Sequence, residues 1–403
     1  MEKINVNGID LILDRVKGTS VAVFVRVKVG SNYENRDEAG ICHLIEHMVF
    51  EGTKTKSAME LSNSIEKYGG EMNAFTDNEK TVYYVRIAKK HTGLAFETLS
   101  DMIKNSVFNE KSLEKEKKVV ADEINMVWDD PKIYQWTVLL NKLFNKNPVK
   151  NPIYGRKGTV LKVNRKKIID FYNKYYVKEN TEVIVIGDFN KPEIVKLVKD
   201  NFNNLRKGKG SKREIINEKP LNNLITYSEK KKINQSYMVV GFRTMPRDDE
   251  ESYVIDVINA ILCKGQSSKL FDEIRTKRGL AYILGSYTDN GTDYGFLGIY
   301  IGTNKKNIPK IKEIIFTEIN KLKKISDKDL KKAKDYQEGA YLLQMEEKDK
   351  RGMLISAWDL TNNLKDLENY VKKINKVSKE DVVRVVNKYL NEKNSAIITL
   401  EQI

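Results

Sequence analysis

Residues 43–47 read His43-Leu44-Ile45-Glu46-His47 and contain two of the three histidines in this chain of 403 residues. A helix turns about 100° per residue, so His43, Glu46 and His47 would lie within one arc of a single face. Two imidazoles four positions apart can share one metal ion, and the carboxylate beside them can reach a water at that ion. Imidazole and carboxylate are ligands that zinc favours. The stretch therefore predicts a zinc-binding helix rather than a helix with two incidental histidines.

The other candidate ligands near this motif are less suitable. His91 follows two lysines and is expected at the surface. Cys42 adjoins His43, but consecutive helical residues face about 100° apart, so a packed thiol is the better interpretation. Cys42 and Cys263 are too few for a disulfide framework, which favours a reducing compartment.

A third ligand is expected from the stretch 112–128, which reads as a helix. It begins with a serine, and its apolar residues recur at mixed three- and four-residue spacings. Glu116 and Glu123 are seven positions apart within it, so they lie on one face. Considered alone, each would be a solvated glutamate on a charge-rich helix.

The pattern as a whole resembles the pitrilysin-type zinc metalloproteases, or inverzincins, which include insulin-degrading enzyme and the mitochondrial processing peptidase. The resemblance rests on HxxEH followed by a glutamate 76 positions after the second histidine. It implies that His43, His47 and Glu123 bind zinc and that Glu46 is the general base. Glu116, seven positions before the ligand glutamate, would support the site.

Two further segments near the motif are similar to the same family. Residues 50–53 (FEGT) match its F-x-G-T, and residues 69–76 (GGEMNAFT) resemble its G-x-x-x-N-A-x-T strand, which borders the cleft. The resemblance implies that an extended peptide adds to this strand at Asn73 and Ala74 through main-chain hydrogen bonds. Residues 152–155 (PIYG) read as a turn without a functional assignment.

Length and composition fit a soluble protein of two domains. Hydrophobic residues make up 40% and charged residues 32% of the chain, and no apolar run approaches the roughly 20 residues of a membrane span. The first residues lack the features of a signal peptide, so a cytoplasmic protein without membrane partners is expected. The net charge of +15 comes from lysines interspersed with acidic residues, which indicates solvated faces rather than nucleic-acid binding.

The chain repeats itself. Asn173-Lys174-Tyr175 followed by Asn180 recurs at 387–389 and 394, an offset of 214 positions, and both runs precede strand candidates, at 183–186 and 397–400. The two halves also begin alike, with strand candidates at 21–29 and 237–243 that lead through acidic segments to helices. Such internal similarity indicates two copies of one α/β unit.

The second copy lacks the zinc motif. The offset of 214 places Val257, Ala260 and Ile261 opposite His43, Glu46 and His47, and the second half contains no histidine. We therefore expect a zinc-binding catalytic domain at 1–205, a flexible linker at 206–216 and a homologous non-zinc domain at 217–403 that contributes to substrate binding.

The resemblance also implies a fold and an assembly. The fold class is α+β, with two duplicated α/β sandwich domains, each a mostly antiparallel sheet with helices on one side. In the family, two such halves face two others across a closed chamber. A chain with two domains resembles the short bacterial form and would pair as a homodimer.

The second half carries one more family segment. Residues 267–282 (SSKLFDEIRTKRGLAY) resemble S-S-x-L-F-x-x-x-R ending in G-L-x-Y, which implies that Arg275 and Tyr282 reach the substrate. A guanidinium can donate to peptide carbonyls and a phenol to an oxyanion. Without the resemblance, a surface arginine and a half-buried tyrosine would be the simpler interpretation. Arg278, about one turn away, is a possible substitute for Arg275.

The resulting prediction is a zinc-dependent endopeptidase with one Zn²⁺ per chain, which cleaves extended or unfolded peptides inside the chamber of a homodimer. The alternative is a non-catalytic or hetero-oligomeric partner subunit of a processing-peptidase-like assembly. The complete motif set argues against a non-catalytic subunit. The presence of Arg275 and Tyr282 in the same chain favours self-pairing.

Overall fold

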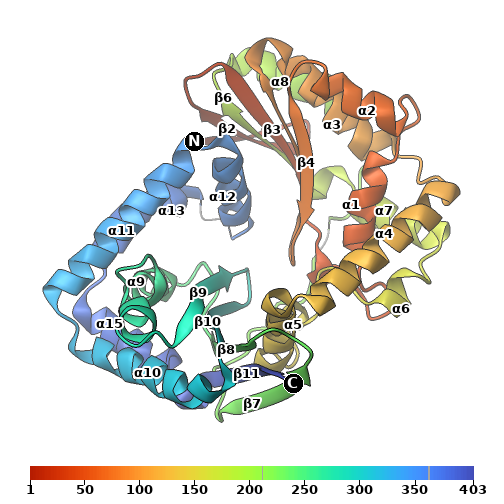
Figure 1. Cartoon of the computed structure of the whole chain (residues 1–403). Coiled ribbons are helices and arrows are strands. Elements are labelled where there is room, and N and C mark those ends of the chain that lie inside the picture. The colour runs from red at the N-terminus through yellow and green to blue at the C-terminus, as the bar shows by residue number, and fades with distance from the viewer. Residues whose placement is uncertain (211, 362–363) are drawn as a thin grey trace. The chain divides into compact units, whose positions relative to one another are not determined.

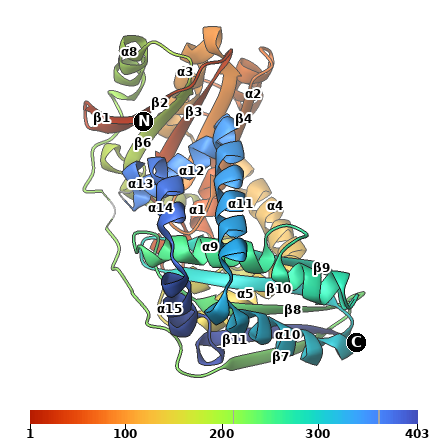
Figure 2. The ribbon, with the colours of Figure 1, turned by 90° about the vertical axis from the view of Figure 1, so that its left-hand side faces the viewer.

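The computed structural model describes residues 1–210, 212–361 and 364–403, which form two compact units (Figures 1 and 2). Unit 1 consists of Met1–Met126, Asn151–Glu214 and Met345–Leu360, and unit 2 of Val127–Lys150, Ile215–Gln344 and Thr361–Ile403. The expected contiguous boundaries, 1–205 and 217–403, do not follow this packing, because each half contributes a segment to the other unit. The passage from Glu214 to Ile215 falls within the predicted linker 206–216, whose Ser211 lies outside the described residues.

Unit 1 contains a six-stranded sheet in the order β1-β2-β6-β3-β5-β4. Its strands are Glu2–Val6 (β1), Ile9–Arg15 (β2), Ser20–Val27 (β3), Glu71–Thr76 (β4), Thr81–Ala88 (β5) and Thr181–Gly187 (β6). Neighbouring strands are antiparallel except β2 and β6, which are parallel. The strands predicted at 21–29 and 183–186 are confirmed as the adjacent strands β3 and β6.

One face of this sheet carries the main helical layer. Side chains alternate between faces along a strand, so the valines at 21, 23, 25 and 27 of β3 all enter one core with the helices. These helices are Ile41–Phe50 (α1), Ala58–Glu66 (α2), Thr92–Asn105 (α3), Glu110–Asp129 (α4), Lys157–Val160 (α6), Arg165–Tyr175 (α7) and Lys191–Phe202 (α8). The helix predicted at 112–128 is confirmed as α4.

The opposite face of the unit 1 sheet is covered by α12 (Lys348–Leu360), a helix of the second half. Gly352 lets α12 approach closely, because a Cβ there would lie 2.2 Å from the ring of Phe24. Arg26 is fully buried on this face and donates to Asp359 (Nη2–Oδ2, 2.6 Å) and to the Ser356 carbonyl. This buried ion pair joins α12 to β3.

Unit 2 contains a five-stranded sheet in the order β7-β11-β8-β10-β9. Its strands are Ile225–Lys231 (β7), Ser236–Arg243 (β8), Ala281–Asn290 (β9), Gly295–Thr303 (β10) and Ser395–Gln402 (β11). Its helices are Pro131–Leu143 (α5), Glu251–Cys263 (α9), the π-helix Phe271–Thr276, Ile308–Lys321 (α10), Asp327–Glu346 (α11), Leu364–Glu368 (α13), Tyr370–Lys376 (α14) and Lys379–Tyr389 (α15). Short 3₁₀ turns lie at 31–33, 89–91, 148–150, 178–180, 305–307, 322–324 and 392–394.

The helix α5, from the first half of the chain, packs on the sheet of unit 2. Here the glycines are on the strands, and the large side chains are on the helix. A Cβ on Gly241 would lie 2.5 Å from Leu139, and one on Gly298 would lie 2.3 Å from the ring of Trp136. The two units therefore exchange a helix, and each exchanged helix lies close to its sheet because glycines make room.

The two sheets confirm the duplication predicted from the repeat. Without β1, the order β2-β6-β3-β5-β4 in unit 1 equals β7-β11-β8-β10-β9 in unit 2, and the first pair is parallel in both. In this correspondence α9 and α11 are the counterparts of α1 and α4. Both sheets are mostly antiparallel, as expected. The main helical layer lies on one face of the unit 1 sheet, as predicted, but α12 adds a helix on its other face.

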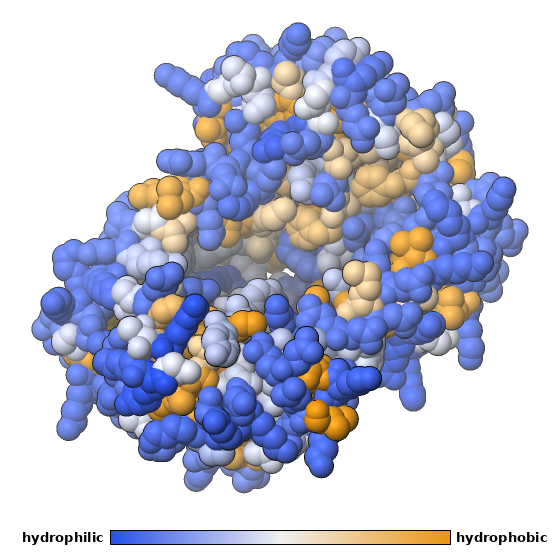
Figure 3. Space-filling model, in the orientation of Figure 1, coloured by the Kyte–Doolittle hydropathy of each residue, from blue (hydrophilic) through white to orange (hydrophobic). Residues whose placement is uncertain are grey.

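The surface shown in Figure 3 is mostly hydrophilic, with apolar residues in small groups. No helix within the described residues is both long enough and apolar enough to span a bilayer.

Candidate metal centre

The predicted zinc helix, α1, is fixed at its N-terminus by the carboxyl group of Glu34 and by two glycines. Glu34 accepts from the backbone N–H groups of Gly40 (2.8 Å) and Cys42 (2.9 Å). Burial outweighs these two hydrogen bonds and raises the pKa of Glu34 to about 8. Gly40 adopts φ 93° and Gly155 φ 73°, and their backbones cross so closely that a Cβ on Gly155 would lie 2.3 Å from the Ala39 carbonyl. This crossing places the 152–155 turn beside the helix.

His43, His47 and Glu123 converge on one point, with α1 supplying the histidines and α4 the glutamate. The Nε2 atoms of His43 and His47 each lie 3.6 Å from Glu123 Oε2, and one ligand atom from each residue lies within 4.8 Å of the others. Donors at zinc distances in a tetrahedron are about 3.3 Å apart, so a small contraction would accommodate the ion. Three donors leave a fourth position open. The described residues contain no other trio of His, Cys, Asp or Glu with this convergence.

The electrostatics of His43 suit a neutral ligand. Burial, with a smaller effect from His47, lowers the pKa of His43 to about 3, so its imidazole keeps a lone pair at neutral pH. The ring of His43 is edge-on to Tyr154, with 4.8 Å between ring centroids. Its Nδ1 is buried and has no hydrogen-bond partner in the described part of the chain, so Nε2, which faces Glu123, is the atom positioned to bind a metal.

His47 is oriented by Glu116. The Nδ1 of His47 lies 3.1 Å from Glu116 Oε2, a contact that places a proton on Nδ1 and leaves the Nε2 lone pair toward Glu123. Lys115 in turn lies 3.1 Å from both Glu116 and Glu51. Glu116 thus contacts only His47, at its Nδ1 atom, whereas Glu123 faces the Nε2 atoms of both histidines.

Glu46 lies on the same helix face as the two histidines. Burial raises the pKa of Glu46, although a hydrogen bond from Thr76 and the proximity of His47 oppose that shift. The Thr76 hydroxyl donates to Oε2 of Glu46 (2.5 Å), which leaves Oε1 as the oxygen available to a proton. Thr76 was not singled out from the sequence, although it ends the 69–76 segment.

Asn73 and Ala74 lie on β4, at the end of the strand order of the unit 1 sheet. Asn73 is exposed, and its Oδ1 accepts from the N–H of Ala74 at 2.8 Å. The strand thus lies at the edge of the sheet, with one backbone donor covered by a side chain.

Arg275 and Tyr282 belong to unit 2, so the cluster on α1 and α4 is built without them. Arg275 is exposed, with its guanidinium carbon 5.1 Å from the centre of the Phe271 ring, and it forms no ion pair among the described residues. Tyr282 is the second residue of β9 and is 78% exposed. Arg278 is ion-paired with Glu273, which makes Arg275 the freer of the two arginines.

Comparison with known proteins assigns the chain to a family. A family model described as insulinase (peptidase family M16) matches residues 11–157, and one described as the peptidase M16 inactive domain matches residues 162–336. The uncharacterized zinc protease YmxG of Bacillus subtilis is 33% identical over 84% of this chain and 83% of its own length. The chain belongs to peptidase family M16. The family resemblance inferred from the motifs is thereby confirmed.

Other M16 relatives and solved structures agree. An uncharacterized zinc protease of Rickettsia felis is 30% identical over 94% of this chain and 92% of its own length. A protease from Helicobacter pylori has the same fold, with a TM-score of 0.94 at 24% identity over 99% of both chains. A peptidase M16 inactive domain from Pseudomonas fluorescens gives a TM-score of 0.91 at 17% identity, over 100% of this chain and 98% of that one.

Proposed function

We propose that this M16 chain is a zinc-dependent endopeptidase that cleaves extended or unfolded peptides, with one Zn²⁺ held by His43, His47 and Glu123. The observation that carries the proposal is the convergence of these three side chains, with ligand atoms within 4.8 Å of one another, beside the buried carboxylate of Glu46. The names of relatives such as YmxG, an uncharacterized zinc protease, support the choice of metal.

The donor set fits zinc, since neutral imidazole nitrogens and a carboxylate oxygen are its usual ligands. Bound there, zinc would supply a Lewis acid that polarises the scissile carbonyl and makes water more acidic. Glu46 takes the proton of the attacking water on Oε1, because Thr76 occupies Oε2. Its raised pKa makes it a better base, and the same carboxyl returns the proton to the leaving amine.

Glu116 is the positioning residue for His47. Its hydrogen bond to Nδ1 fixes the tautomer in which Nε2 carries the lone pair. Glu123, which faces both histidines, has the ligand role. The two glutamates of α4 therefore have different roles: Glu116 orients His47, and Glu123 binds the metal.

The substrate would bind as an added strand. β4 is at the sheet edge, and a peptide backbone could pair with it near Asn73 and Ala74 once the Asn73 side chain moves off the Ala74 N–H. Arg275 and Tyr282 would donate to substrate oxygens. Their exposure and, for Arg275, the absence of an ion pair within the described residues support this role.

A homodimer enclosing a chamber is the assembly we propose, because the chain carries two α/β units and the family resemblance implies four around a chamber. Sedimentation velocity of the full chain tests the pairing, and a purely monomeric active enzyme would contradict it. A comparison of an unfolded protein with its folded form as substrates tests the exclusion of folded chains.

The central experiment measures bound metal and peptide hydrolysis on the full chain. We expect about one zinc per chain, and hydrolysis that a chelator abolishes and added zinc restores. His47→Gln should lose both metal and activity, whereas the matched control His91→Gln should keep both, because His91 is stacked on Tyr68 and is not part of the ligand cluster. Equal zinc content in wild type and His47→Gln would refute the assignment of the cluster.

A further inference from the structure

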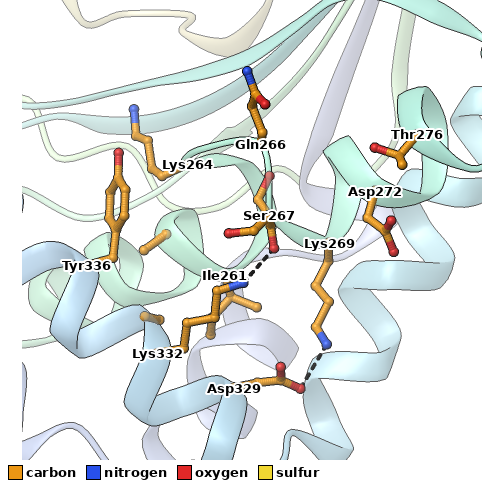
Figure 4. A pocket seen from close by; sticks show the side chains of 13 residues that line it. Ile261, Lys264, Gln266, Ser267, Lys269, Asp272, Thr276, Asp329, Lys332 and Tyr336 are labelled. Carbon is orange, nitrogen blue, oxygen red and sulfur yellow. Dashed lines mark hydrogen bonds and ion pairs between the residues drawn. The ribbon is translucent and has the colours of Figure 1, made fainter.

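A cavity of about 330 Å³ lies in unit 2 between the end of α9, the segment that follows it and α11 (Figure 4). α9 and α11 are the counterparts of α1 and α4, which build the metal centre. The offset of 214 pairs Ala260 and Ile261 of the cavity wall with Glu46 and His47. The cavity therefore includes two α9 positions that correspond to the metal centre, whereas Val257 and Gln337, which correspond to His43 and Glu123, are not part of its lining.

The side chains that line the cavity are mostly hydrogen-bond donors. Three lysines contribute to its lining, together with hydroxyl and amide side chains: Lys264, Lys269, Lys332, Ser267, Ser268 and Gln266. Ser268 is only 4% exposed, and its hydroxyl has no hydrogen-bond partner among the described residues. A buried hydroxyl without a partner costs free energy, which a ligand with acceptor atoms would recover.

Two of the three ammonium groups have no carboxylate partner within the described residues. Lys269 is paired with Asp329 at 2.8 Å, and Asp272 is paired with Lys277 at 2.7 Å. Lys332 instead reaches the carbonyl of Ser267 at 2.7 Å (Figure 4), and Lys264 reaches the carbonyl of Ser286 at 3.4 Å. An ammonium has three donors, so Lys264 and Lys332 each keep donors for a ligand.

We infer that this cavity binds an anion of the phosphoryl type through Lys332 and the hydroxyl of Ser268, while the ammonium of Lys264 points away from Lys332 (Figure 4). A phosphoryl group carries about −1.5 to −2 charges at neutral pH and three acceptor oxygens, which can accept from the ammonium of Lys332 and the hydroxyl of Ser268. The remaining carboxylate of the wall, Asp329, does not oppose such a ligand strongly, because Lys269 and Ser326 hold it.

The size of the cavity indicates a phosphorylated small molecule rather than phosphate alone. About 330 Å³ is at the lower end of the range of small-molecule sites and exceeds the needs of one phosphate ion. Both kinds of ligand carry a phosphoryl group. Titration with inorganic phosphate and with a phosphate monoester such as glucose 6-phosphate distinguishes a free phosphate ion from a phosphorylated small molecule.

The test is calorimetric titration of the full chain with inorganic phosphate and with glucose 6-phosphate, at constant ionic strength. Ser268→Ala removes only the buried hydroxyl, and Lys332→Gln removes an exposed ammonium without disturbing a core. Lys331→Gln is the matched control, because this neighbour on α11 is paired with Asp335 and does not line the cavity. Circular dichroism and thermal melting confirm that each variant folds.

We expect one site per chain whose affinity falls about tenfold or more in Ser268→Ala and in Lys332→Gln, as loss of one charge-assisted hydrogen bond would produce. Lys331→Gln should match wild type. Tighter binding of glucose 6-phosphate than of phosphate would establish the larger ligand, and the reverse would establish a phosphate site. Absence of binding to both probes, or equal affinity in all four proteins, would overturn the inference.

Discussion

The metal centre of unit 1 and the lysine-lined cavity of unit 2 both lie between corresponding helices in two copies of one fold, yet their chemistry is opposite. In unit 1, two histidines of α1 and a glutamate of α4 converge to hold a cation. In unit 2, α9 and α11 frame a cavity with three lysines and an unpartnered serine. In both units, the sheets and buried helix faces keep the pair of helices in place. The chemistry depends on a few side chains between them, which can change without altering the scaffold.

For the metal centre of unit 1, the substitution with the largest expected effect is Glu46→Gln. The amide is the same size and can still accept the Thr76 hydrogen bond, but it cannot take a proton from water. We expect bound zinc to remain and peptide turnover to fall by about 10²–10⁴. Steady-state hydrolysis and metal analysis of the same sample check this. Wild-type turnover in this variant would remove Glu46 from the role of base.

The two glutamates of α4 provide the next test, because unit 2 has no glutamate at either equivalent place. Glu123→Gln removes a ligand and should abolish stoichiometric zinc binding. Glu116→Gln removes only the partner of His47 and should weaken zinc binding by about 10–100-fold. Competition with a zinc-sensitive dye measures both affinities. The reverse order would show that the ligand and the positioning residue have been exchanged.

The exchanged helices extend the comparison to the stability of the two units. Gly352→Ala on α12 and Gly298→Ala on β10 place a methyl group within 2.2–2.3 Å of Phe24 and Trp136, respectively. Each should lower the free energy of unfolding by about 1–3 kcal/mol, measured by urea denaturation. Gly339→Ala is the control, because a Cβ there meets nothing within 4 Å and alanine favours a helix. Destabilisation by the control alone would contradict this account of the packing.

The smallest expected effect is the pH dependence of the metal-free protein. The pKa of His43 is about 3 in the folded chain, against an ordinary value of 6.5. The unfolded state therefore binds the extra proton between these pH values, and stability falls as the pH decreases through this window and is fully present above it. Between pH 7 and pH 5 the loss should be on the order of 1–2 kcal/mol. Unfolding at both pH values should show a smaller difference in His43→Gln than in wild type or His91→Gln.

Much of the candidate site could be predicted from the sequence, because its residues lie close together in helices. The spacing of His43, Glu46 and His47 on α1 and of Glu116 and Glu123 on α4 is set by helix geometry, and the family motif connects the two helices. Thr76 and Tyr154 could not be found in the same way. Their contacts with Glu46 and His43 depend on how a strand end and a turn pack against α1.

The sequence by itself determined that the chain contains two α/β copies and that only the first has a histidine-glutamate motif. Periodicity is a local property that reports which residues form a helix and which face is apolar, and the repeat is visible by comparing the sequence with itself. Only the tertiary structure decided that residues 127–150 and 345–360 pack in the other half's unit, and that a donor-lined cavity forms between α9 and α11. Both depend on contacts between segments far apart in the chain. An apolar helix face can cover any sheet that offers a complementary surface.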